Sequence, residues 1–210
     1  QREAEIQGFT SRPFYVPEIT CGGFTASGDK LTEKQAAEAV RRECDRQTAS
    51  VLSVEKQTKN VQPPRLYDLT TLQRECNRIY GYTAQQTLDY LQSLYEKKLA
   101  TYPRTDSQYL TEDMQATATS LILWLRDNMP FGKGCLGEPD IDRVTDGSKV
   151  TDHHAIIPTV EIARTDLSVL PSGERDVLTL IAMRLLCATG QTHRFEAVTA
   201  VLDCAGHPFT

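Results

Sequence analysis

Residues 83–107 read TAQQTLDYLQSLYEKKLATYPRTDS and join a helical pattern to a short polar segment. Thr83 and Gln86 have the spacing of a capping box, in which each side chain accepts a hydrogen bond from the other residue's backbone N–H. The apolar residues that follow recur at i, i+3, i+7 and i+11, which is one face of a helix: Leu88, Leu91, Tyr95 and Leu99. We predict a helix from Thr83 to about Leu99, followed directly by a loop.

Three more helices are predicted in the central part of the chain, each from apolar residues at helical spacing. They run from Thr70 to about Tyr80, onward from about Thr111, and from about Ser172 to Thr189. Gly81 and Gly190 directly follow two of these helices, at the position where a glycine often ends one. Residues 130–150 are rich in glycine, aspartate and proline and are predicted to be a loop.

The two ends of the chain have strand patterns instead. Residues 13–26 mix β-branched and aromatic residues around a Gly-Gly pair, residues 49–57 resemble another strand, and residues 195–202 alternate with a period of two. Between the first two segments, residues 32–47 are predicted to be a helix that begins with a Thr32–Gln35 capping box.

This order predicts an α+β fold in which a mostly β domain is interrupted by a helical domain. The boundary after the first β segment is placed at Pro63-Pro64, because proline removes a backbone donor and stops regular structure. The predicted division is residues 1–65 and 191–210 for the β domain and residues 66–190 for the helical domain.

Composition excludes several classes of protein. No apolar run approaches the roughly 18 to 20 residues that cross a bilayer, so a membrane protein is not expected. The net charge of −5 argues against a chain coated in basic surface, although residues 55–104 carry 8 positive and 5 negative groups. The six cysteines form no CxxC pair, so we expect no zinc site, but half-buried reduced thiols in a cytoplasmic protein.

The first candidate for chemistry is Tyr102-Pro103-Arg104. A tyrosine has a pKa near 10, so about one phenol in a thousand is ionised at pH 7, and a nucleophilic role needs nearby positive charge or a base. Pro103 favours an extended Tyr102, and residues i and i+2 of an extended segment point to the same side. Phenol and guanidinium could therefore converge on one phosphate. The alternative is a loop whose tyrosine ring packs on a helix end.

Two further segments are candidates. Residues 151–159 read TDHHAIIPT, and adjacent histidines such as His153 and His154 point in different directions, which suits a phosphate contact or proton transfer better than chelation. A solvated loop before an apolar run explains the same residues. Residues 63–75 read PPRLYDLTTLQRE, where Thr70, Gln73 and Arg74 are either DNA contacts or the start of a capped helix.

Together, the three segments resemble type IA DNA topoisomerases, in the family's order and over about residues 60–160. Tyr-Pro-Arg-Thr-Asp-Ser followed by His-His-Ala-Ile-Ile-Pro-Thr is closer to the topoisomerase III branch than to topoisomerase I.

The resemblance implies an isomerase that needs no ATP. Tyr102 would attack a phosphodiester of single-stranded DNA, form a 5′-phosphotyrosine link and release a 3′ hydroxyl, while Arg104 neutralises the phosphate. His153 would contact DNA near the break, and the other expected DNA contacts are Asp106, Thr105 and Lys98. The β domain would be the gate and hinge that opens for strand passage, relaxing or decatenating DNA.

The family's Toprim domain, whose acidic cluster binds Mg²⁺, and its four-helix domain with the rest of the DNA groove have no counterpart in these residues. We therefore expect a central fragment that binds no metal itself and is inactive alone. Its expected partners are single-stranded DNA and the missing domains, with a helicase as a further candidate.

Two other functions remain open at this stage. One is a non-catalytic module that binds single-stranded nucleic acid by stacking and phosphate contacts. The other is a metal-dependent phosphodiesterase built on Asp152, His153 and His154, which would need more ligands than the neighbouring sequence offers.

Overall fold

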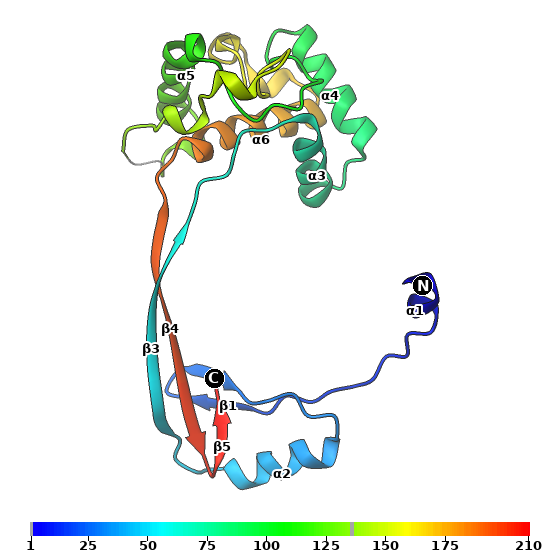
Figure 1. Cartoon of the computed structure of the whole chain (residues 1–210), viewed down its shortest axis with the longest axis vertical. Coiled ribbons are helices and arrows are strands. Elements are labelled where there is room, and N and C mark those ends of the chain that lie inside the picture. Colours follow the sequence, from blue (N-terminus) through cyan, green and yellow to red (C-terminus); the bar gives the residue numbers. More distant parts are fainter. Residues whose placement is uncertain (1, 135–136) are drawn as a thin grey trace. The chain divides into compact units, whose positions relative to one another are not determined.

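The computed structural model describes residues 2–134 and 137–210. The α+β class is confirmed, with helices and strands in the expected order (Figure 1). The elements are α1 (Arg2–Gln7), β1 (Glu18–Cys21), β2 (Phe24–Ser27), α2 (Lys34–Cys44), β3 (Ser50–Val61), α3 (Leu69–Tyr80), α4 (Ala84–Glu96), α5 (Gln115–Asn128), α6 (Ser172–Ala188), β4 (His193–Cys204) and β5 (His207–Phe209). The short helix α1 was not predicted.

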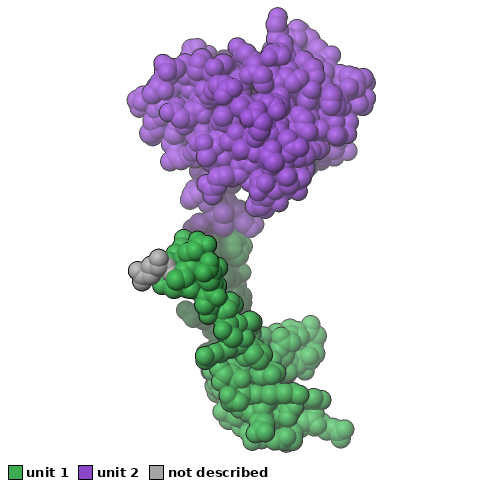
Figure 2. Space-filling view, turned by 90° about the vertical axis from the view of Figure 1, so that its right-hand side faces the viewer, with its two compact units in different colours: residues 1–59, 194–210 green, residues 60–193 purple. Residues whose placement is uncertain are grey.

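The chain divides into two compact units, which are coloured separately in Figure 2. Unit 1 consists of residues 1–59 and 194–210, and unit 2 of residues 60–193. Every helix in the described ranges is too short or too polar to cross a bilayer.

Unit 1 contains antiparallel strand pairs and one packed helix. Strands β1 and β2 pair from Glu18 opposite Ser27 to Cys21 opposite Phe24, and a second sheet has the order β3-β4-β5. The turn between β1 and β2 needs φ values of 53° at Gly22 and 101° at Gly23, which glycine adopts without steric cost. The small core contains Ala26, Cys44, Leu202, Cys204 and Phe209.

The predicted capping box of α2 is wrong. The N-cap is Glu33, and it makes no side-chain capping bond. Leu31 is held in an antiparallel bridge with Tyr15, through backbone hydrogen bonds of 2.8 Å in both directions. Because this bridge keeps the backbone extended at Leu31, the helix begins one residue too late for Thr32 to cap it.

Unit 2 is a helical bundle around one core. Helix α6 packs against both α4 and α5, and α3 packs against α4 (Figure 1). Since α6 has neighbours on several sides, it buries much of its circumference, including Val177, Leu178, Ile181 and Leu185. The helix that was predicted onward from about Thr111 is divided, because a 3-10 turn at Glu112–Met114 precedes α5.

The helix starts around the central segment are largely as predicted. Thr83 and Gln86 form the expected capping box, with bonds of 3.1 and 2.9 Å. Gly81 ends α3 with φ 73° and donates to Asn77 O at 3.0 Å, so its predicted role is confirmed. Helix α3 begins at Leu69, one residue early, because Asp68 and not Thr70 caps it.

One predicted helix end is wrong, and another lies where it was predicted but is not closed by its glycine. Helix α4 stops at Glu96, short of Leu99, because Lys98 adopts φ 61° and turns the backbone away from the helical path. Gly190 does not end α6 in the left-handed conformation. Instead Thr189 caps the helix, and its hydroxyl donates to Leu185 O at 2.9 Å.

The expected loop at residues 130–150 contains three short 3-10 turns in its described part: Pro130–Gly132, Asp142–Val144 and Gly147–Lys149. Of the cysteines, Cys44, Cys76 and Cys204 are fully buried and Cys187 is exposed, so the expectation of half-burial fits Cys21 alone among the described thiols. Cys135 lies outside the described residues.

Candidate functional site

Backbone hydrogen bonds join the three candidate segments within unit 2. The segment at residues 151–159 lies between the other two. Ile156 N donates to Tyr67 O at 2.8 Å on one side, and on the other Thr101 N donates to Ile157 O at 3.0 Å. The segment at residues 63–75 also meets the Tyr102 segment directly, because Leu69 N donates to Thr105 O at 3.1 Å.

Burial of the apolar residues explains this arrangement. Ala155, Ile156 and Ile157 are all buried in the core of unit 2, together with Leu99 and Ala100. Since a buried backbone amide needs a partner, the extended segments satisfy one another's N–H and C=O groups. The apolar run is thus the anchor that fixes the preceding histidines beside the Tyr102 loop.

Tyr102 lies between an aromatic ring of α4 and a histidine. Its ring centroid is 4.1 Å from that of His153, with an interplanar angle of 33°, and 5.5 Å from that of Tyr95 in an edge-to-face contact. Tyr102 is half-buried, and within residues 2–134 and 137–210 its hydroxyl has no hydrogen-bond partner. The ring therefore does pack on a helix end, and it is also adjacent to His153.

Arg104 and His153 line a pocket of about 470 Å³. Its other walls come from the first residues of α3, from Thr105 and Asp106, and from Thr151 and Asp152. The Arg104 side chain is exposed and has no ion-pair partner among the described residues. A guanidinium without a carboxylate partner is available for an external anion, and it matches phosphate oxygens well.

The remaining expected DNA contacts lie in different environments. Asp106 is exposed and lines the pocket. Thr105 also lines the pocket, but its hydroxyl is committed to the fold, because it donates to His153 O at 2.8 Å and accepts from Ser107 N at 3.1 Å. Lys98 is exposed and does not line the pocket.

The start of α3 contributes one pocket residue that the sequence suggested, Thr70, and two that it did not, Asp68 and Leu69. Thr70 lines the pocket, whereas Gln73 points to the start of α4 and donates to Ala84 O at 3.0 Å. Asp68 lines the pocket, accepts from Thr71 N at 2.6 Å as the helix cap and accepts from Gln108 at 3.0 Å.

Tyr95 was placed on the apolar face of the predicted helix, but it does not belong to the core. It is 40% exposed, and Leu94 occupies the core in its place. The helix ends at the next residue, so the ring of Tyr95 lies at the rim of the unit, where it meets Tyr102. The sequence did offer one indication of the contact with Tyr102, because Tyr95 lies in the last turn of the helix before the Tyr102 loop.

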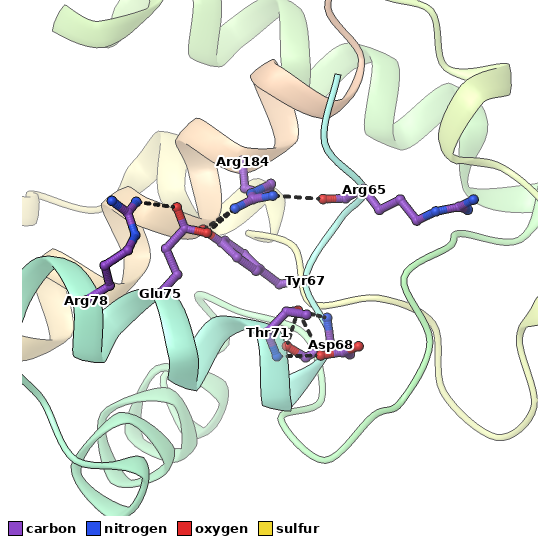
Figure 3. Close-up of polar contacts among 7 residues, drawn as sticks. All are labelled: Arg65, Tyr67, Asp68, Thr71, Glu75, Arg78 and Arg184. Atoms are coloured by element: carbon purple, nitrogen blue, oxygen red, sulfur yellow. Dashed lines mark hydrogen bonds and ion pairs between the residues drawn. The ribbon is translucent and has the colours of Figure 1, made fainter. Parts of the chain in front are cut away.

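Arg184 of α6 fixes the segment that leads into α3 (Figure 3). It donates to the Tyr67 hydroxyl at 2.9 Å and to Arg65 O at 3.3 Å, and it forms an ion pair with Glu75. Its guanidinium also lies 4.1 Å from the centroid of the Tyr67 ring. Burial raises the pKa of the Tyr67 phenol above its usual range, against the lowering effect of Arg184. The phenol is therefore a neutral structural group.

The described residues do not fit a magnesium ion. No group of three or more histidine, cysteine, aspartate or glutamate side chains in these ranges is arranged to hold a metal. Asp68 lines the pocket, but its carboxylate already accepts from Thr71 and Gln108. The reaction proposed for Tyr102 therefore uses no metal ion bound by these residues.

Comparison with known proteins gives a consistent result. Residues 1–210 match the sequence model of a family described as DNA topoisomerase. The chain is 33% identical over 217 residues to DNA topoisomerase 3 of Staphylococcus saprophyticus, and 33% identical over 223 residues to DNA topoisomerase 3 of Bacillus subtilis. In both cases the match covers all of this chain and 30% of the relative, so the chain spans less than a third of their length.

A solved structure shares the fold. Topoisomerase I from Thermotoga maritima superposes with a TM-score of 0.73 at 23% sequence identity, covering 99% of this chain and 35% of that one. The resemblance to type IA topoisomerases of the topoisomerase III branch is thus confirmed by sequence relatives. The match over all 210 residues establishes that this chain belongs to the DNA topoisomerase family.

Proposed function

We propose that these residues are the central part of a longer, topoisomerase III-like type IA enzyme, and that Tyr102 is its nucleophile. The phenol oxygen attacks the phosphorus of a phosphodiester in single-stranded DNA. A 5′-phosphotyrosine bond forms, the bond from phosphorus to the 3′ oxygen breaks, and the 3′ oxygen takes up a proton. The 3′ hydroxyl later reverses the reaction. No ATP is needed, because one phosphodiester is exchanged for another.

The contact between Tyr102 and His153 beside the pocket is the observation that carries this proposal. Their ring centroids are 4.1 Å apart, and His153 and Arg104 line the same pocket. In the proposed reaction, Arg104 holds the scissile phosphate and stabilises its developing charge. His153 contacts the DNA next to the break, and proton transfer is a further proposed role, because it suits an imidazole. Asp106 lines the same pocket and is a further proposed DNA contact.

The parts of the reaction outside these residues are proposed from the resemblance. Mg²⁺ would be held by the acidic cluster of a Toprim domain elsewhere in the polypeptide, and unit 1 would belong to the gate that lifts for strand passage. The 210 residues alone would then fail to relax supercoiled DNA, and relaxation of plasmid by this chain with Mg²⁺ would refute that part. The cytoplasm as location and a helicase as partner likewise remain proposals.

A non-catalytic module for single-stranded nucleic acid is the second candidate. The partly exposed rings of Tyr95 and Tyr102, with the unpaired Arg104 nearby, also suit base stacking and phosphate contact. This candidate predicts binding of DNA without a covalent product. A metal-dependent phosphodiesterase is not proposed, because the ring of His153 packs on Tyr102 while Nδ1 of His154 lies 2.8 Å from Ala155 O.

Trapping of the covalent product distinguishes the two candidates. The full-length protein is incubated with 5′- and 3′-labelled single-stranded DNA and Mg²⁺, denatured, and analysed for labelled protein. We expect a protein–DNA adduct that is absent in Tyr102→Phe and retained in Tyr80→Phe, a matched loss of a hydroxyl elsewhere in unit 2. An adduct that persists in Tyr102→Phe would exclude Tyr102 as the nucleophile. Binding without any adduct would favour the non-catalytic module.

A further inference from the structure

Tyr109 has two cations close to its ring. The guanidinium carbon of Arg65 lies 4.7 Å from the ring centroid, and Nζ of Lys149 lies 4.6 Å from it. An aromatic face attracts a cation, so one ring can hold two positive side chains that would otherwise separate in solvent. We refer to Arg65, Tyr109 and Lys149 as the Tyr109 cluster.

The cluster is connected to the pocket through each of its members. Each member is close in sequence to a residue that lines the pocket. Arg65 is three residues from Asp68, and Tyr109 is three residues from Asp106. Lys149 is two residues from Thr151.

Side-chain bonds fix the connecting segments. Ser107 donates to Lys149 O at 2.9 Å, and Gln108 donates to Asp68 at 3.0 Å. The cluster therefore lies beside the pocket as a fixed part of the same surface of unit 2.

The cluster has a surplus of positive charge. Lys149 forms an ion pair of 2.6 Å with Asp146, and this bond is the main cause that lowers the pKa of the Asp146 carboxyl. Arg65 has no carboxylate partner in the described ranges, and its side chain points away from the network of Arg184 and Glu75 (Figure 3). One carboxylate thus faces two exposed cations, which leaves the cluster able to bind an anion.

We propose that the Tyr109 cluster binds the phosphodiester backbone of single-stranded DNA next to the proposed cleavage site, with Arg65 and Lys149 each contacting one phosphate. This inference rests on the proposed function, because it assigns a second anchor to the strand whose scissile phosphate lies at Arg104. Phosphate contacts of this kind fix the register of a strand and do not read its sequence. Tyr109 holds the two cations in place.

Binding of a fluorescein-labelled oligothymidylate to the full-length protein, measured by anisotropy over a range of salt concentrations, tests the inference. The Tyr102→Phe background prevents cleavage. Each phosphate contact to a single strand contributes about 0.7 to the slope of log affinity against log salt, which corresponds to about fivefold in affinity at 0.1 M salt. We expect Arg65→Gln and Lys149→Gln each to reduce the slope and the affinity by these amounts.

Two further variants complete the experiment. Arg164→Gln is the matched control, because Arg164 is an exposed cation paired three residues away with Glu161, as Lys149 is with Asp146. It should leave slope and affinity unchanged. Asp146→Asn should change the affinity for DNA in the opposite direction. It removes the carboxylate that competes for Lys149, so DNA should bind more tightly.

The possible results separate the two proposals. If Arg65→Gln and Lys149→Gln match Arg164→Gln in slope and affinity, the cluster is not a phosphate site, and the proposed function stands as long as Tyr102 still forms the adduct. If the protein neither binds the oligonucleotide nor forms an adduct, both proposals fail. Arg65→Lys and Lys149→Arg keep the charge, so they should keep the slope of log affinity against log salt of the unchanged cluster. A reduced slope in these two variants would also contradict the inference.

Discussion

Replacement of Arg184 by alanine should destabilise unit 2 by about 3 kcal/mol. Tyr67 is 1% exposed, so its hydroxyl would lose the hydrogen bond from Arg184 in a place without water, which costs about 1–3 kcal/mol. Glu75 would lose its ion pair with Arg184 as well, but its side chain is 25% exposed, and solvent reduces that loss to about 1 kcal/mol.

Residues 1–210 contain one tryptophan, which makes an assay on this chain specific. Trp124 lies in α5 and packs on the core of unit 2, so urea unfolding followed by its fluorescence reports on that unit. Arg78→Ala is the control, because Arg78 pairs with the same Glu75 at 3.2 Å but is 72% exposed, and its loss should cost less than about 0.5 kcal/mol.

A second substitution separates the contribution of the Tyr67 hydrogen bond from that of the Glu75 ion pair. In the Arg184→Ala background, Tyr67→Phe removes a buried hydroxyl that has lost the hydrogen bond from Arg184, so it should recover part of the lost stability. In the unchanged protein the same substitution should cost about 1 kcal/mol. If Arg184→Ala costs no more than Arg78→Ala, or if Tyr67→Phe costs the same in both backgrounds, the network does not hold this segment as described.

Three other predictions concern unit 2. Burial raises the pKa of the Cys76 thiol from 9.0 to about 11, so the unfolded chain releases this proton first. The contribution of this thiol to stability should be fully present below pH 9 and be lost between pH 9 and about 11, so stability should decrease less over this range in Cys76→Ala in the same fluorescence assay. Gly173→Ala should lower stability by about 1–3 kcal/mol in urea unfolding, because the added Cβ would lie 2.4 Å from the ring of Tyr90; equal or greater stability would show that the ring moves aside freely. Tyr95→Ala should slow formation of the Tyr102 adduct about two- to tenfold, the effect of about 0.5–1.5 kcal/mol for an aromatic pair, whereas Tyr95→Phe should retain the rate; equal rates in both variants would contradict a positioning role.

Elements determined by short-range contacts could be predicted from the sequence. The capping box of Thr83 and Gln86 and the left-handed Gly81 depend on residues within four positions, and both are present as expected. The wrong predictions were caused by contacts between residues that are distant in sequence or by the path of the chain between elements. Thr32 does not cap α2 because Leu31 is bound to Tyr15, and α4 ends early because Lys98 turns the chain toward the next segment.

The same distinction applies to the candidate site. Tyr102 and Arg104 belong to one short motif, and their convergence on one phosphate was argued from backbone geometry alone, so it stays a prediction. The contact of Tyr102 with His153 was expected only through the family resemblance. The role of Arg184 had no local signal, because Arg184 meets Tyr67 across 117 positions of sequence. Likewise, Arg65, Tyr109 and Lys149 come from three separate segments that only the folded core brings together.

The central claim is that the phenol of Tyr102 becomes bonded to a 5′ phosphate of DNA. Digestion of the trapped adduct with nuclease and protease, followed by peptide sequencing in the mass spectrometer, locates that bond directly. We predict a nucleotide attached through its 5′ phosphate to Tyr102, in the peptide that contains Thr101 and Pro103. A nucleotide on any other residue, or one attached through its 3′ phosphate, would contradict the account.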